Sequence, residues 1–132
     1  MENEKIRVLL IEDNPGDARL VEEALNEVAT NGLIDIQIEL RWFNLLQTGL
    51  SYLSGGGYDV ILLDLNLPDG EGFDNIDEIF KVTTSTPIII LSGVQDDVRA
   101  EEAVNRGAYE YISKNELVGD RLIKSIYRAL GK

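Results

Sequence analysis

Aliphatic residues are concentrated in five short segments of the chain, at residues 7–11, 34–43, 60–63, 87–91 and 109–112. The first, third and fourth segments are almost continuously apolar, which is typical of strands covered on both faces of a sheet. The second alternates apolar and polar residues, as a strand with one buried face does. The pattern therefore predicts five β-strands.

The intervals between these strands carry apolar residues at spacings of three and four, which is the period of an α-helix. Before the first interval, Asn14-Pro15-Gly16-Asp17 has the order of an N-cap, a proline in the first turn and an acid three residues into the helix. The apolar faces of the five predicted helices are Val21, Ala24, Leu25 and Val28; Leu46, Gly49, Leu50 and Leu53; Phe73, Ile76, Ile79 and Phe80; Val98, Ala103, Val104 and Gly107 (the weakest pattern); and Leu122, Ile123, Ile126, Tyr127 and Leu130. Strict alternation of strand and helix predicts an α/β fold, a doubly wound parallel sheet with helices on both faces.

The composition argues against several classes of function. The 132 residues fit one domain, and 24 acidic against 12 basic residues give a net charge of -12, which disfavours binding to nucleic acid or anionic membrane. The chain has no cysteine and no histidine, which excludes disulfides, zinc sites built on these residues and a histidine phospho-relay within the chain. Its first residues carry no apolar run suited to a signal peptide, so we expect a cytoplasmic protein.

Polar residues follow four of the five predicted strands. Glu12 and Asp13 come after the first strand, Asp64 ends the third, Ser92 follows the fourth and Lys114 follows the fifth. Each has an ordinary structural reading when taken alone, as a loop acid, a turn former or a surface lysine. In a doubly wound sheet, however, the carboxyl ends of the strands meet where ligands bind. Three carboxylates together raise one another's pKa unless a cation lies among them, and Mg²⁺ suits such oxygen ligands.

Four segments around these residues resemble the signature regions of the response-regulator receiver family. They read LIEDN at 10–14, LLDLNLPDG at 62–70, ILSG at 90–93 and YISK at 111–114. The second is the most specific, and the likeness extends over residues 7–130. The opening IEDNPGDARLVEEAL is similar to CheY-like stand-alone receivers of the cyanobacterial phytochrome response regulator type. The resemblance implies a single receiver domain over residues 1–132 and a flavodoxin-like sheet in the strand order 2-1-3-4-5.

The resemblance also implies the roles of the site residues. Asp64 would accept a phosphoryl group from the phosphohistidine of a sensor histidine kinase. Mg²⁺ would be held by the carboxylates of Asp13 and Asp64 and by the backbone carbonyl of Asn66, with Glu12 reaching it through a water. Lys114 would contact the phosphoryl oxygens. The chain would then be no conventional enzyme, but a phosphoacceptor that catalyses its own phosphorylation and slow dephosphorylation.

Signal output is implied in the same way. Ser92 would contact the phosphoryl group and move together with Tyr111, which matches the aromatic switch position of the family. The change would reach a surface formed by the fourth helix, fifth strand and fifth helix, at about residues 98–127. There we expect a downstream protein or a second copy of the chain, and neither nucleic acid nor membrane.

Two positions depart from the family pattern. Glu12 stands where the family more often has aspartate, so the ion would sit slightly differently. Asn115 follows Lys114 where the family usually has a proline, often after a cis peptide bond. A cis bond before a non-proline residue costs roughly 2.5–4 kcal/mol, which puts the shape of this loop in question. Trp42, the only tryptophan, is expected at the far end of the second strand, too distant to report metal binding.

Three other functions share parts of this pattern. A flavin mononucleotide protein would share the fold, but its first loop binds phosphate, and here that loop is acidic. A phosphatase of the haloacid-dehalogenase type would need a second aspartate two residues after the nucleophile, where this chain has Asn66. A receiver-like docking module that is never phosphorylated is the remaining alternative.

Overall fold

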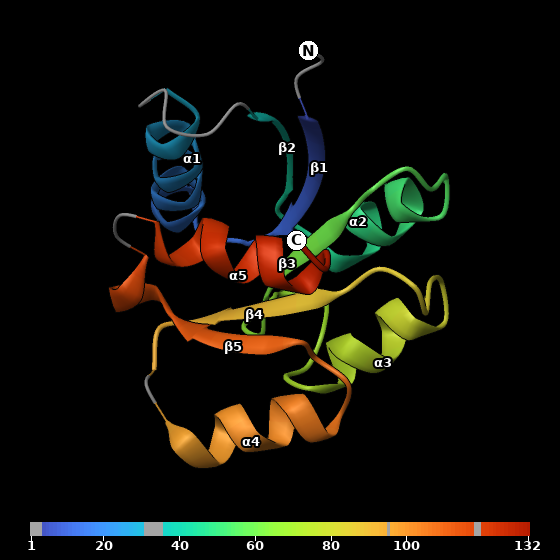
Figure 1. Cartoon of the computed structure of the whole chain (residues 1–132). Coiled ribbons are helices and arrows are strands. Elements are labelled where there is room, and N and C mark those ends of the chain that lie inside the picture. The colour runs from blue at the N-terminus through green and yellow to red at the C-terminus, as the bar shows by residue number, and fades with distance from the viewer. Residues whose placement is uncertain (1–3, 31–35, 95, 118–119) are drawn as a thin grey trace.

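The computed structural model describes residues 4–30, 36–94, 96–117 and 120–132, and their strands form one parallel sheet (Figure 1). The strands are β1 (Glu4–Ile11), β2 (Ile36–Phe43), β3 (Val60–Asp64), β4 (Ile88–Ser92) and β5 (Glu110–Ser113), in the order β2-β1-β3-β4-β5. This is the doubly wound fold that the sequence pattern predicted, in the strand order that the family resemblance implied. The first two residues of the predicted second strand, 34 and 35, lie outside the described residues.

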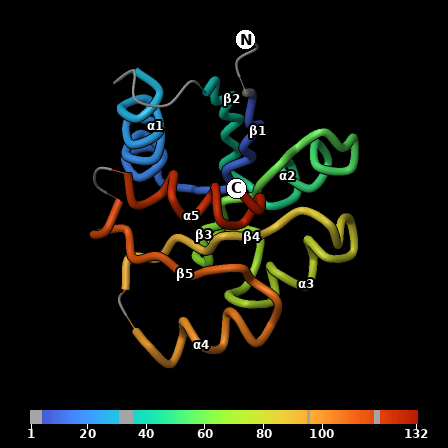
Figure 2. The backbone as a smooth tube through the Cα atoms, viewed as in Figure 1, coloured from blue at the N-terminus to red at the C-terminus, as the bar shows by residue number. Residues whose placement is uncertain are grey.

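The helices between the strands are α1 (Pro15–Thr30), α2 (Leu46–Leu53), α3 (Asp74–Phe80), α4 (Asp97–Asn105) and α5 (Arg121–Ala129), with a short 3₁₀ helix η1 (Lys114–Glu116) after β5. Helices α1 and α5 cover one face of the sheet, and α2, α3 and α4 cover the other (Figures 1 and 2). Within the described residues, no helix is long and apolar enough to cross a membrane.

Side chains alternate between the two faces along each strand, and this alternation decides where the strand-end residues point. Leu10 and Leu62 pack into the core under α1 and α5, whereas Ile11 and Leu63 pack on the opposite face. Two residues beyond Leu10 comes Glu12, and two beyond Leu62 comes Asp64. Both acids therefore leave the sheet on the side of α1 and α5.

The start of α1 follows the prediction closely. Its first residue is Pro15, and the Oδ1 atom of Asn14 accepts a hydrogen bond from the backbone N–H of Asp17 at 3.1 Å. This is the N-cap contact expected of that order of residues. Helix α2 also has its predicted inner face, because a side chain at Gly49 would collide with Ile11.

The predicted inner face of α4 is wrong in part. Ala103 is buried, but Val98 and Val104 are 76% and 50% exposed. Val98 lies five residues before Ala103, and Val104 lies one residue after it. In a helix with 3.6 residues per turn, neither of them is therefore on the side that faces the sheet. Helix α4 therefore presents two large apolar residues to solvent.

Candidate functional site

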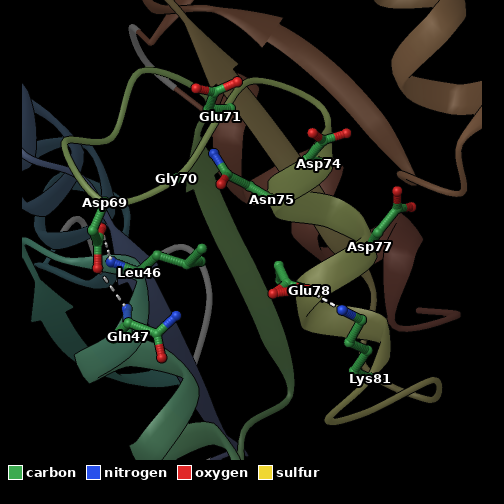
Figure 3. A pocket seen from close by; sticks show the side chains of 10 residues that line it. All are labelled: Leu46, Gln47, Asp69, Gly70, Glu71, Asp74, Asn75, Asp77, Glu78 and Lys81. Atoms are coloured by element: carbon green, nitrogen blue, oxygen red, sulfur yellow. Dashed lines mark hydrogen bonds and ion pairs between the residues drawn. The ribbon is translucent and has the colours of Figure 1, made fainter.

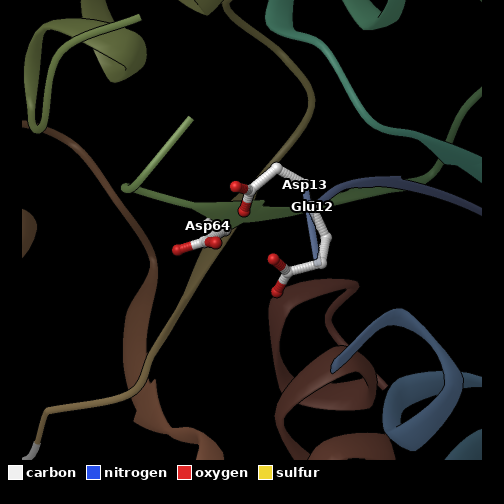
Figure 4. Close-up of side chains that lie close together, drawn as sticks. All are labelled: Glu12, Asp13 and Asp64. Carbon is white, nitrogen blue, oxygen red and sulfur yellow. The ribbon is translucent and has the colours of Figure 1, made fainter. Parts of the chain in front are cut away.

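Three carboxylates meet at the ends of β1 and β3, as the sequence predicted. One oxygen of each of Glu12, Asp13 and Asp64 lies within 4.8 Å of the others, and Figure 4 shows the three side chains gathered at the two strand ends. Glu12 and Asp64 are 0% and 4% exposed, whereas Asp13 is open to solvent. Among the described residues, this is the one group of three acids with converging oxygens. The cluster is thus buried at its base and accessible at its mouth.

Lys114 enters the cluster from the end of β5. Its Nζ atom lies 2.8 Å from Oε1 of Glu12, 2.7 Å from Oδ2 of Asp17 and 3.5 Å from Oδ2 of Asp64. The contact with Asp17 was not predicted, since the sequence presented this residue only as an acid in the first turn of α1. Asp17 and Lys114 are 97 residues apart in the chain. The only local feature of Asp17 that suggests an electrostatic role is its position in the first turn of a helix.

The electrostatics of the cluster favour an additional cation. Burial, and then the neighbouring Asp64 carboxyl, raise the pKa of Glu12 to about 8, although Lys114 and the N–H of Asn14 oppose the change. Burial works against the charge on Lys114, but its bonds to Asp17 and Glu12 outweigh burial and raise the pKa of the ammonium. One lysine therefore contacts three acids, while Asp13, the fourth acid of the site, has no ion pair with it.

The donor set fits Mg²⁺, which prefers a few carboxylate oxygens and keeps several waters. Oε2 of Glu12 accepts a hydrogen bond from Asn14 at 3.1 Å. Its buried Oε1 lies 2.8 Å from the Lys114 ammonium, as an ion pair, and has no further hydrogen-bond partner among the described residues. A buried acceptor of this kind can receive a hydrogen bond from a metal-bound water.

Asp64 and the loop after it are held by local contacts. Oδ1 of Asp64 accepts a hydrogen bond from the backbone N–H of Asn66 at 3.1 Å, so the chain turns sharply after β3. Farther along, the Asp69 carboxylate accepts hydrogen bonds from the N–H groups of Leu46 and Gln47, at 2.8 and 2.9 Å, at the start of α2 (Figure 3). The loop that carries Asn66 is thereby fixed to a second helix.

A hollow of about 430 Å³ between α2 and α3 is a different feature from this site (Figure 3). Its lining includes five acids, Asp69, Glu71, Asp74, Asp77 and Glu78, and Lys81, which pairs with Glu78 at 2.6 Å. None of the site residues predicted from the sequence lines it. The hollow therefore gives no argument about the chemistry at Asp64.

Ser92 and Tyr111 both bond to the same backbone residue. The Oγ atom of Ser92 accepts from the N–H of Val94 at 3.2 Å, and the Tyr111 hydroxyl donates to the carbonyl of Val94 at 2.9 Å. Ser92 ends β4 beside β3, where Asp64 pairs in register with Leu91. A movement of the Ser92 side chain would therefore shift the backbone of Val94, to which the Tyr111 hydroxyl is bonded.

The peptide bond between Lys114 and Asn115 is trans. The N–H of Asn115 donates to Oγ of Ser113 at 3.3 Å, a bond that a proline at this position would lack. Asn115, in place of the family's usual proline, thus adds a hydrogen bond to the N-cap residue of η1.

The expectation for Trp42 is wrong. Its indole Nε1–H donates to the backbone carbonyl of Glu12 at 2.6 Å, so this residue lies against the acidic loop. The second strand runs parallel to the first, with Trp42 opposite Leu10 and Phe43 opposite Ile11. Residues 42 and 43 consequently lie at the same sheet edge as the acids.

The fold and site define a class of protein, and comparison with known sequences agrees with it. Residues 8–127 match the family model of the response regulator receiver domain. The chain therefore belongs to the response regulator receiver domain family.

Known relatives and structures agree with this assignment. The chain is 35% identical over 112 residues to a cell cycle response regulator CtrA of Brucella ovis, covering 83% of this chain and 44% of that protein. It thus spans less than half the length of this relative. A receiver domain protein of Clostridium thermocellum is 26% identical, with a TM-score of 0.78 over 96% of this chain and 94% of that one. The beryllofluoride-activated receiver domain of RstA from Klebsiella pneumoniae, 18% identical, shares the fold with a TM-score of 0.79 over 96% of this chain and 99% of that one.

Proposed function

We propose that this protein is a phosphoacceptor of two-component (phosphorelay) signalling, which takes a phosphoryl group from a sensor histidine kinase onto Asp64. The observation that carries the proposal is the position of the Asp64 carboxylate. It ends a fully buried strand, lies among two other carboxylates and is 3.5 Å from the ammonium of Lys114. Family membership supports the same reading.

The proposed chemistry is a direct transfer between two proteins. An oxygen of the Asp64 carboxylate attacks the phosphorus of a phosphohistidine, a P–O bond forms, and the P–N bond breaks with its electron pair passing to the imidazole of the kinase. Lys114 offsets the charge on the phosphoryl oxygens, and the Ser92 hydroxyl donates a hydrogen bond to one of them. A water later attacks the phosphorus slowly, the bond between Asp64 and phosphorus breaks, and inorganic phosphate leaves with the Asp64 carboxylate restored. The protein is in this sense a phosphoacceptor that catalyses its own modification.

Mg²⁺ fits this site as the cofactor. Asp13, Asp64 and the backbone carbonyl of Asn66 would hold it, and Glu12 would reach it through a water. When bound, the ion neutralises negative charge on the transferring phosphoryl group. The turn from Asp64 to Asn66 supports this set, because it keeps the backbone of Asn66 beside the carboxylate.

Two other functions fit the site less well. A phosphatase of the haloacid-dehalogenase type needs a carboxylic acid at the position of Asn66 to handle a proton. A docking module that is never phosphorylated has no use for a lysine that contacts three acids at the end of β5. Of these two alternatives, the docking module is the better supported.

Output is proposed to run through the surface formed by α4, β5 and α5, toward a downstream protein or a second copy of the chain. Val98, Val104 and Tyr109 are large apolar residues exposed there. The arginines at this surface are partly engaged already, since Arg121 and Arg128 lie 2.6 and 3.5 Å from the Glu110 carboxylate. The aliphatic residues of α4 are therefore the stronger anchors. A cytoplasmic location follows from the proposed kinase donor.

Beryllofluoride, a mimic of the phosphoryl group, tests the proposal with a binding readout. Fluorine NMR of the protein with Mg²⁺ should show a bound signal that disappears on removal of Mg²⁺ and in Asp64→Asn. Asp59→Asn, a change immediately before β3 and away from the acids, is the matched control and should keep the signal. A folded wild-type protein without any bound signal would contradict the proposal, and rapid turnover of acetyl phosphate would favour the phosphatase.

A further inference from the structure

Trp42 holds the backbone of the acidic loop from the neighbouring strand. The β1–β2 ladder ends with Ile11 opposite Phe43, and the N–H of Glu12 then donates to the carbonyl of Phe43 at 3.0 Å. On the other side of the same residue, the carbonyl of Glu12 accepts the short 2.6 Å bond from the Trp42 indole. The end of β2 therefore holds the backbone of Glu12 through hydrogen bonds to both its N–H and its C=O.

The bonded carbonyl belongs to the peptide plane that joins Glu12 to Asp13. Since a peptide unit is planar, a bond to this carbonyl restricts ψ of Glu12 and φ of Asp13, two of the dihedrals that set the backbone from which both side chains project. These side chains are two of the three carboxylates in the cluster with Asp64. The indole thus acts on the two acids at once, although it contacts neither carboxylate.

The surroundings of the Trp42 ring indicate that its hydrogen bond matters more than its burial. Trp42 is 43% exposed and borders an open hollow of about 230 Å³ lined also by Pro15, Ala18, Arg19, Glu22 and Leu40. A half-exposed ring gains less from burial than a core aromatic does. Its directed contact is the N–H bond to the loop.

We propose that Trp42 is a positioning residue of the metal site, whose indole N–H orients the Glu12–Asp13 peptide so that both carboxylates face Asp64. The inference rests on the proposed function, because it concerns Mg²⁺ binding by these acids. Loss of the bond lets the peptide plane rotate, and the acids must then be reordered when the ion binds. Outer contacts that orient metal ligands typically contribute about tenfold or more to affinity.

The single tryptophan allows the N–H to be removed without changing the shape of the ring. Expression in a tryptophan auxotroph supplied with 3-benzothienylalanine replaces only position 42, and exchanges the indole N–H for sulfur. Calorimetry should then give an Mg²⁺ dissociation constant about tenfold higher than that of the wild type. Trp42→Phe should show a similar loss, and Tyr52→Leu, another exposed aromatic beside Phe43, should show none.

A second readout requires no substitution. The only indole N–H resonance of the wild-type protein should exchange slowly with solvent for so exposed a ring, and should shift when Mg²⁺ is added. An unchanged Mg²⁺ affinity in the benzothienyl protein, with or without a fall in stability, overturns the positioning role and leaves the proposed function standing. A wild-type protein that binds no Mg²⁺ overturns both.

Discussion

Glu12→Gln should stabilise the metal-free protein at pH 8. Glu12 is fully buried, and the adjacent Asp64 carboxyl adds to the effect of burial, so that its pKa is raised from 4.5 to about 8. The folded state therefore keeps a proton on Glu12 that the unfolded state has released. Stability falls as the pH rises from about 4.5 to 8, because the folded protein binds more protons over this range.

The structure sets the size of the effect. A change from 4.5 to about 8 corresponds to a ceiling on the order of 5 kcal/mol above pH 8, at about 1.4 kcal/mol per pH unit. Glutamine avoids this cost but loses the 2.8 Å contact with Lys114, which keeps its bond to Asp17. We expect a net gain of about 1–2 kcal/mol at pH 8 and a smaller gain at pH 5, where Glu12 is protonated in the folded state.

Urea unfolding in the presence of a chelator, at pH 5 and pH 8, measures the difference. Glu27→Gln, which removes an exposed acid from α1, is the control for the general relief of net negative charge. Saturating Mg²⁺ should reverse the order, since a ligand of the folded state stabilises the wild type more than a variant that binds it less well. A Glu12→Gln protein no more stable than the control at pH 8 would show that the buried Glu12 carboxyl does not destabilise the folded protein.

Three further results are expected. Asp13→Ala should weaken Mg²⁺ binding in calorimetry by about tenfold or more and Glu12→Gln by less, because a water-bridged ligand contributes less than a direct one; equal losses would contradict this division. Gly70→Ala should lower the free energy of unfolding by about 2 kcal/mol, because its methyl group would collide with a buried side chain of α3, whereas Gly93→Ala meets no neighbour and serves as the control. Beryllofluoride should change amide exchange across residues 98–127, and changes limited to the loops around Asp64 would place the output elsewhere.

The sheet could be predicted from the sequence because parallel strands buried on both faces require nearly continuous apolar runs. β3 and β4 are buried along their whole length, and their predicted limits lie within one residue of those observed. The convergence of Glu12, Asp13 and Asp64 followed from the same pattern, since parallel neighbouring strands end at one edge.

Contacts that depend on side-chain reach and helix rotation could not be predicted in this way. The bond from Lys114 to Asp17 joins residues 97 positions apart, and the bond from Trp42 to Glu12 depends on the register of β1 against β2. The rotation of α4 buries Ala103 in the core and exposes Val98, and the helix has no strong apolar stripe from which this rotation could be predicted.

Chemical identification of the modified residue tests most directly whether Asp64 is the phosphoacceptor. The protein is incubated with acetyl phosphate and Mg²⁺, the acyl phosphate is reduced with borohydride, and the digested peptides are sequenced by mass spectrometry. We expect one phosphoryl group per chain and a single reduced aspartate, at position 64, with none in Asp64→Asn. A folded protein that stays unmodified, or that carries the modification at another residue, would show that Asp64 is not the phosphoacceptor.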